Sequence, residues 1–193
     1  MKKIFALLLI VLFPTLVFAQ TNKTQEIKRI DSLIKQIDNF VKRNSKTFEV
    51  YADVSQTEKP QWRKFKSEKA LEKFREHTET YQIAYVWRRS GKVIAANFTN
   101  FSGSGDWAHY LNYYFRPDGS LAKIEADLDT FYGNAIVERQ FYFVKNGELL
   151  RRTKRVSDLK THKPKKLNED FIDEEVYLFK KVSKLPFASL LRN

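Results

Sequence analysis

Hydrophobic residues between positions 85 and 152 recur in three segments with the same spacing. Each segment has an aromatic residue four positions before a glycine and an aliphatic residue two positions after it, and the glycines are Gly91, Gly119 and Gly147. A polar residue followed by glycine is typical of a tight hairpin turn, because glycine readily adopts the left-handed conformation that closes such turns. The pattern therefore predicts three tandem hairpins, which form one antiparallel meander over residues 80–156.

Apolar residues with helical spacing precede the predicted sheet. Between residues 25 and 43 they recur every three or four positions, and charged residues lie between them. This is the pattern of an amphipathic helix, and its apolar face consists of Ile27, Ile30, Leu33, Ile34, Ile37, Phe40 and Val41. Fewer than three clean heptads favour a helix that packs on the core of its own domain over a coiled coil.

Shorter segments complete the expected α+β fold. Residues 47–55 alternate between apolar and polar and predict a half-buried strand, and residues 67–77 begin with the good N-cap residue Ser67 and predict a second helix. After a basic loop at 157–168, an acidic start followed by lysines predicts a C-terminal helix or strand and a docked tail over 169–193. The expected architecture is a twisted antiparallel meander of six to seven strands, with the N-terminal, second and C-terminal helices packed on one face.

The first nineteen residues have the pattern of an export signal. Two lysines precede an apolar run over residues 4–18, and the run ends at Ala19, a residue that suits a signal peptidase. We expect cleavage before Gln20, which leaves a single domain over 20–193 in the periplasm or outside the cell, with no transmembrane helix. An N-terminal membrane anchor is the alternative, but the run is short for a span of about 20 residues.

Composition narrows the possible chemistry. The chain contains no cysteine, which excludes disulfides, a thiolate nucleophile and cysteine metal sites. No His-x-His or His-Glu-x-x-His spacing is present, and no metal or other cofactor is predicted. The formal net charge is +12, and removal of the signal leaves 33 basic and 23 acidic residues. This balance favours an anionic partner, whereas no motif supports nucleic-acid binding.

Basic residues concentrate after the predicted sheet. Residues 151–166 include eight Lys or Arg and one acid. One interpretation is that they hold anionic lipid head groups, cell-wall polymers or acidic glycans. The other is structural, because edge strands often carry Lys and Arg that block pairing with another sheet. The candidate anion-binding residues are Arg151, Arg152, Lys154, Arg155, Lys163, Lys165 and Lys166.

One histidine is a candidate for acid–base chemistry. If the register of the central hairpin is extended from Phe115 opposite Leu121, His109 lies opposite Asp127, and Glu125 and Asp129 share its face. A carboxylate beside an imidazole fixes its tautomer and raises its basicity. The alternative is a cross-strand charge pair on a solvated sheet. The opposite face, with Tyr110, Tyr114, Ile124 and Leu128, is predicted to be the core side.

Aromatic residues are more numerous in the meander than one core face requires. Fifteen of the 28 aromatics fall between positions 81 and 143. In the same register Trp107 and Tyr113 lie on the face of His109, and a two-residue turn at Gly133 and Asn134 places Tyr142 there too. We therefore predict that Trp107, Tyr113 and Tyr142 contact a ligand.

The repeated phrase aromatic-x-aromatic-x-x-[Ser/Asp/Asn]-Gly-x-aliphatic resembles the hairpin units of Rhs-type and MORN-type repeat proteins. Separately, the order of strand, short helix, six-stranded meander and terminal helix is similar to the helix-grip arrangement of START-like lipid carriers. That resemblance implies a curved sheet wrapped around a long helix and an apolar cavity. The helix predicted before the first strand departs from the arrangement.

We expect a non-catalytic binding module whose ligand is an apolar small molecule, an anionic envelope component or another envelope protein. One alternative is a hydrolase-type acid–base enzyme that uses His109 and Asp127 with Glu125 or Asp129. Another is a structural or inhibitory protein that interacts through its sheet edge or aromatic face. A closed apolar cavity favours a carrier, a cleft at His109 favours an enzyme, and a flat sheet without a pocket favours a protein partner.

Overall fold

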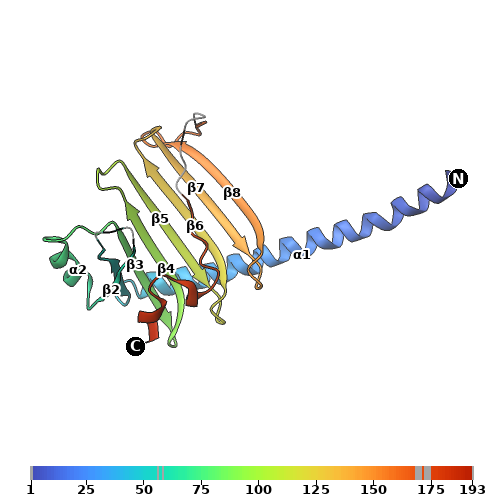
Figure 1. Ribbon diagram of the computed structural model, residues 1–193. Coiled ribbons are helices and arrows are strands. Elements are labelled where there is room, and N and C mark those ends of the chain that lie inside the picture. Colours follow the sequence, from blue (N-terminus) through green and yellow to red (C-terminus); the bar gives the residue numbers. More distant parts are fainter. Residues whose placement is uncertain (1, 56, 58, 168–170, 172–174, 193) are drawn as a thin grey trace.

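The computed structural model describes residues 2–55, 57, 59–167, 171 and 175–192, with side chains described between 22 and 191. Within these residues, two α-helices accompany one eight-stranded antiparallel sheet of order β2-β1-β3-β4-β5-β6-β7-β8 (Figure 1), which confirms the α+β class. The elements are α1 (Lys2–Arg43), β1 (Glu49–Asp53), β2 (Trp62–Phe65), α2 (Glu68–Arg75), β3 (Gln82–Arg89), β4 (Lys92–Phe101), β5 (Trp107–Phe115), β6 (Leu121–Thr130), β7 (Ala135–Phe143), β8 (Leu149–Asp158) and the 3-10 helices η1 (Val182–Lys184) and η2 (Ala188–Arg192).

The predicted meander is confirmed. Strands β3 to β8 pair as successive antiparallel neighbours. Gly91, Gly119 and Gly147 close three of the turns with φ of +74°, +79° and +86°, a region that side chains rarely adopt. The register shifts beside each of these turns, and such an irregularity bends and twists the strands locally.

Helix α1 packs its apolar stripe on one face of the sheet, which we call the α1 face. Ile30, Ile34 and Ile37 are buried there against a cluster that includes Ile94 and Tyr114. The remaining members of the predicted stripe pack on the same cluster, which confirms its orientation. In Figure 1 the helix crosses behind the strands.

The opposite face is covered by residues 175–191, and we call it the tail face. Phe187 is fully buried there and stacks on Tyr51 with ring centroids 4.3 Å apart. The predicted C-terminal helix is wrong for the described part, because residues 175–180 have no regular secondary structure and Lys181 forms an isolated β-bridge with Ser120. Residues 168–170 and 172–174 lie outside the described residues. The capping residue and the order of charges favour a helix only weakly. Packing of Phe179, Leu185 and Phe187 on the sheet stabilises the non-helical path of the tail instead.

The tail runs across the hairpin turns at one end of the sheet, which we call the turn end. Lys180 lies against the β7–β8 turn. The backbone N–H of Val182 then donates to the Gly119 carbonyl at 3.0 Å in the β5–β6 turn. Beside the β3–β4 turn, Arg88 Nη2 donates to the Leu191 carbonyl at 2.7 Å. The tail therefore crosses the three turns in reverse order of the chain.

The region before the meander differs from the prediction in two respects. Strand β2 was not predicted, because its four residues also fit the approach to the following helix. The strand predicted as half-buried, β1, is buried on both sides, since Tyr51 lies under the tail. The second helix is confirmed, with Ala70 N–H donating to the Ser67 hydroxyl at 3.2 Å.

Candidate functional site

The predicted pair of His109 and Asp127 is separated by the sheet. Phe115 pairs with Leu121 as expected, but Tyr114 pairs with Lys123, so one extra residue interrupts the register. A slip of one residue exchanges the faces of all later side chains. His109 consequently pairs with Leu128 and Asp127 pairs with Tyr110. The predicted register is wrong, and the two side chains lie on opposite faces.

His109 belongs to the core of the tail face. Its side chain is 2% exposed, and Arg139, which is 3% exposed, lies beside it with Nη2 at 3.1 Å from His109 Nε2. A guanidinium only donates hydrogen bonds, so this contact requires the imidazole Nε2 to accept and the ring to be neutral. This environment is that of a satisfied buried histidine.

The three predicted carboxylates lie on the α1 face with Glu138, which pairs with Asp127. Burial raises the pKa of Asp127, and the neighbouring Glu138, Glu125 and Asp129 raise it further. Burial also raises the pKa of Asp129. Glu125 differs from them, because Lys123 Nζ lies 2.6 Å from its carboxylate and the Tyr114 hydroxyl donates to it at 3.2 Å. The imidazole that acts on this acidic surface is that of His162, which opposes the rise in the pKa of Asp129, whereas His109, which the acid–base hypothesis requires, lies on the other face.

Two tyrosines tie this acidic surface to α1. The Tyr142 hydroxyl donates to Asp31 Oδ1 at 2.9 Å. The Tyr114 hydroxyl also bonds to Asp38, whose pKa is raised by burial. The contacts orient the helix on the sheet and give both tyrosines a structural role.

The aromatic residues predicted to contact a ligand do not share a surface. Tyr113 is buried under the tail, where its hydroxyl donates to the Tyr177 carbonyl at 2.7 Å. Tyr142 lies on the α1 face between the cationic groups of Lys123 and Arg151, at 4.7 and 4.4 Å from its ring centroid. Trp107 is half-buried at the start of β5 on the tail face. The prediction of one aromatic contact surface is wrong.

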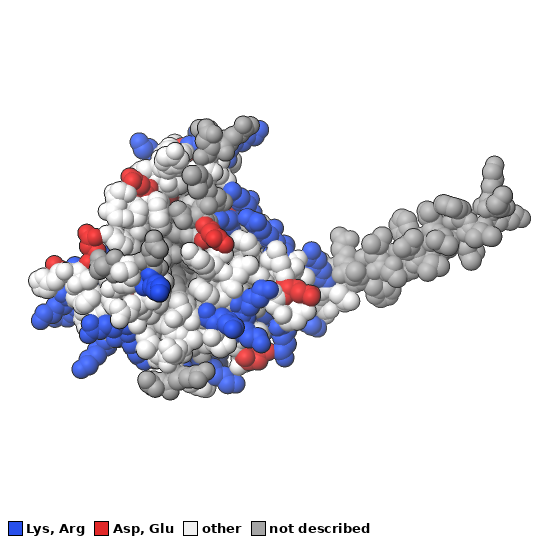
Figure 2. Space-filling model, viewed as in Figure 1, with Lys and Arg blue, Asp and Glu red and all other residues white. Residues whose placement is uncertain are grey.

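The basic residues of β8 lie at an edge of the sheet, as the structural interpretation expects. Their side chains alternate between the faces, with Arg151 and Arg155 opposite residues of the α1 face and Arg152 and Lys154 opposite residues of the tail face. Arg151 and Arg152 lie over aromatic rings, and Arg155 Nε is 3.5 Å from a carboxylate oxygen of Glu138. Figure 2 shows Lys and Arg along this edge.

The rest of the basic run follows β8 in a loop. Lys163 and Lys166 are exposed. Lys165 is partly used within the protein, since its Nζ donates to the Gly133 carbonyl and lies 3.7 Å from Asp158. The predicted anion-binding residues therefore form an edge strand and a separate lysine loop.

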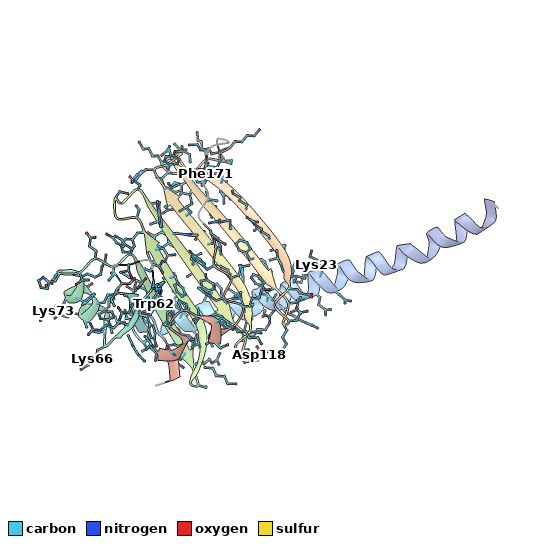
Figure 3. All side chains as sticks on the ribbon, viewed as in Figure 1. Lys23, Trp62, Lys66, Lys73, Asp118 and Phe171 are labelled. Atoms are coloured by element: carbon cyan, nitrogen blue, oxygen red, sulfur yellow. The ribbon has the colours of Figure 1, made fainter. Side chains whose placement is uncertain are left out.

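A pocket of about 520 Å³ opens at the turn end, where the tail crosses the β3–β4 and β5–β6 turns. Its apolar lining consists of Val93, Pro117, Val182, Ala188 and Leu191. The polar and glycine residues around it are Arg88, Gly91, Lys92, Asp118, Gly119, Lys181 and Ser183. Figure 3 places Asp118 at this end and Phe171 at the other end of the sheet. The volume is within the range of small-molecule sites.

The charged groups of this pocket differ in their partners. Arg88 is engaged, with Nε 3.2 Å from Glu49 and hydrogen bonds to two carbonyls. Hydrogen bonds from Ser120 and the nearby Lys145 ammonium lower the pKa of Asp118 to about 2. Lys92 and Lys181 are exposed, and neither forms an ion pair with any residue that the structure describes. Two ammonium groups thus line an apolar pocket without a counter-ion among the described residues.

A second pocket, of about 300 Å³, adjoins the first on the α1 face. Lys92 and Pro117 line both pockets, and the rest of the smaller one includes Leu33 and Ile37 of α1 together with Ile94. Lys92 can therefore reach a ligand in either pocket. Both of these pockets are open to solvent, whereas the helix-grip resemblance implies an enclosed apolar cavity.

Sequence reasoning missed the pocket residues, because they meet only through the path of the tail. Lys92 follows a turn glycine and Lys181 lies in the misassigned C-terminal segment. Gly91 and Gly119, two of the three repeated glycines, mark the β-turns that line the pocket. Nothing in the spacing of the tail indicates that it crosses them.

Within the described residues, no group of His, Asp and Glu is placed to hold a metal ion, and no helix has the length and apolarity needed to cross a membrane. Comparison of the chain with family models, curated proteins and solved structures gives no match.

Proposed function

We propose that the protein is an exported, non-catalytic binding module that holds an amphipathic anion in the 520 Å³ pocket at the turn end. The observation that carries this proposal is the pairing of an apolar floor with Lys92 and Lys181, which have no anionic partner among the described residues. The ligand class that suits these features is a carboxylate, sulfate or phosphate on an alkyl chain.

Two terms contribute to the expected affinity. Each ion pair at an exposed rim contributes up to about 1 kcal/mol, or about fivefold in affinity. Each methylene group buried on the apolar floor contributes about 0.8 kcal/mol, or about fourfold. The affinity should therefore rise with chain length and fall when either the negative charge or a lysine is removed.

Isothermal titration of the exported protein with octanoate, hexanoate and octanol tests both terms. Octanoate should bind more tightly than hexanoate or octanol. A Lys92→Gln/Lys181→Gln double variant should bind octanoate about 5- to 25-fold more weakly. Lys73→Gln is the matched control, because Lys73 is an exposed lysine on α2, away from the pocket (Figure 3).

Some outcomes would contradict the proposal. Equal binding of octanol and octanoate would exclude a role for the ammonium groups. Octanoate binding that the double variant leaves unchanged would place the ligand elsewhere. An absence of octanoate binding to a folded protein would leave the pocket without the proposed ligand class.

Export is a separate part of the proposal. The basic and apolar pattern before Gln20 supports cleavage there. N-terminal sequencing of protein recovered from an exporting host should begin at Gln20. Recovery of the uncleaved chain in the membrane fraction would favour the anchor instead.

A further inference from the structure

The end of the sheet opposite the pocket, which we call the loop end, presents two adjacent aromatic side chains to solvent. Phe131 is 69% exposed and Tyr132 is 66% exposed, in the turn between β6 and β7. Isolated exposed apolar residues are common on proteins, but adjacent exposed rings at a protruding turn suit an interaction surface.

The aromatic turn is held in place by hydrogen bonds. Asn134 N–H donates to the Phe131 carbonyl at 3.0 Å, and Phe131 N–H donates to the Asp106 carbonyl at 2.9 Å. Tyr132 N–H donates to the Thr130 hydroxyl at 3.0 Å. The predicted two-residue turn is therefore a longer one, and its backbone is fixed while its rings point away from the core.

A lysine-rich loop lies beside this turn. Leu159 N–H donates to the Asn134 carbonyl at 3.0 Å, and Lys165 Nζ donates to the Gly133 and Asn134 carbonyls. Asp158 shapes the loop by accepting hydrogen bonds from the N–H groups of Lys160 and Thr161. These contacts hold three exposed lysines near the rings, and the three are Lys160, Lys163 and Lys166.

We propose that the loop end docks on the surface of an anionic lipid bilayer, with Phe131 and Tyr132 at the level of the head groups. Aromatic side chains favour the interface between membrane and water, and lysines within a Debye length are attracted to anionic lipids. A bilayer fits better than a protein groove because the two exposed rings and the three exposed lysines lie on adjacent segments at one end of the sheet. The proposal is independent of the pocket, which lies at the turn end.

Sedimentation of the exported protein with lipid vesicles tests this docking. Binding to vesicles of phosphatidylcholine and phosphatidylglycerol should exceed binding to phosphatidylcholine alone and should weaken with salt. Each lysine contributes about fivefold near an anionic surface, so a Lys160→Gln/Lys163→Gln/Lys166→Gln variant should bind about 100-fold more weakly. Phe131→Ser/Tyr132→Ser should lose at least about tenfold, by loss of ring burial.

Matched variants separate docking from general charge and apolarity. Lys66→Gln/Lys69→Gln/Lys73→Gln removes the same charge near and on α2, and Tyr177→Ser/Leu178→Ser removes two other exposed apolar side chains. Both controls should bind vesicles as the unmodified protein does. The Lys92→Gln/Lys181→Gln variant should also bind them normally, which distinguishes failure of this proposal from failure of the pocket proposal.

Three results would overturn the proposal. The first is no preference for phosphatidylglycerol vesicles in the unmodified protein. The second is unchanged binding by Phe131→Ser/Tyr132→Ser. The third is retention on a heparin column that needs the three lysines while vesicle binding does not, since this would indicate a soluble polyanion as the partner.

Discussion

The α1 face and the tail face belong to the same strands but bury different kinds of side chain. On the α1 face, the helix covers apolar residues near the turn end and leaves Glu125, Asp127 and Asp129 half-buried beyond it. On the tail face, the extended C-terminal segment packs on a larger apolar cluster, and His109 is buried on that face. The comparison shows that the covering segment decides whether a polar residue on a strand is accessible.

The largest expected effect comes from removing the main anchor of the tail. Phe187→Ala should lower the free energy of unfolding by about 3–5 kcal/mol, because it deletes a fully buried ring from a tightly packed site. The lost contacts include Tyr51, Trp62 and Phe98, at centroid distances of 4.3, 5.0 and 5.6 Å. Urea unfolding measures the change. Leu178→Ala, at an exposed tail position, should change stability by less than about 0.5 kcal/mol. A similar small change for Phe187→Ala would mean that the tail does not cover this face in solution.

The equivalent change on the α1 face should be somewhat smaller. Ile34→Ala removes a buried side chain between α1 and the sheet and should cost about 2–5 kcal/mol. The exposed neighbour Lys35→Ala is the control. Urea unfolding followed by circular dichroism should show loss of helix together with the sheet. If helix signal disappears well before the sheet unfolds, α1 is a separate unit and the comparison of the faces fails.

His109 and Asp127 test the face assignment directly. His109→Ala should cost about 1–3 kcal/mol, because it removes a buried partner of Arg139. Asp127→Ala, on the half-buried acidic surface, should stay within about 0.5 kcal/mol. His109→Gln should recover part of the loss by supplying an acceptor. Equal and small effects of both alanine variants would instead support the solvated cross-strand pair expected from the sequence.

The elements that could be predicted from the sequence are those with a regular local spacing of residues. The helical stripe around Ile34 and the turns at Gly91, Gly119 and Gly147 each follow from local spacing, and the structure confirms them. The face of His109 could not be predicted. One extra residue near Gly119 shifts the pairing and moves His109 to the opposite face, and the alternation of apolar and polar residues does not reveal such an extra residue. The tail was also misassigned, since an extended segment that packs on a distant surface has no period of its own.

The smallest expected effect concerns the ionisation of two aspartates in different surroundings. The pKa of Asp127 is raised, first by burial and then by Glu138, Glu125 and Asp129, so the folded protein holds this proton more tightly than the unfolded chain. Its ionisation therefore opposes folding: the stability falls as the pH rises from the ordinary aspartate pKa of 3.8 through the folded pKa, and the penalty is complete above it. Asp127→Asn should raise stability at neutral pH by up to about 0.5 kcal/mol, with no gain in strong acid.

The stability contributed by Asp118, at the turn end, changes with pH in the opposite direction. Its pKa is lowered to about 2 by hydrogen bonds from Ser120 and by Lys145. The ionised form therefore stabilises the fold above the ordinary aspartate pKa of 3.8, and that contribution is lost as the pH falls through the folded pKa. Asp118→Asn should accordingly lower stability at neutral pH and have little effect in strong acid. Thermal unfolding of both variants across this pH range measures the two slopes. Slopes of the same sign would mean that folding stabilises the ionised form of Asp127, against the effects of burial and of the neighbouring carboxylates.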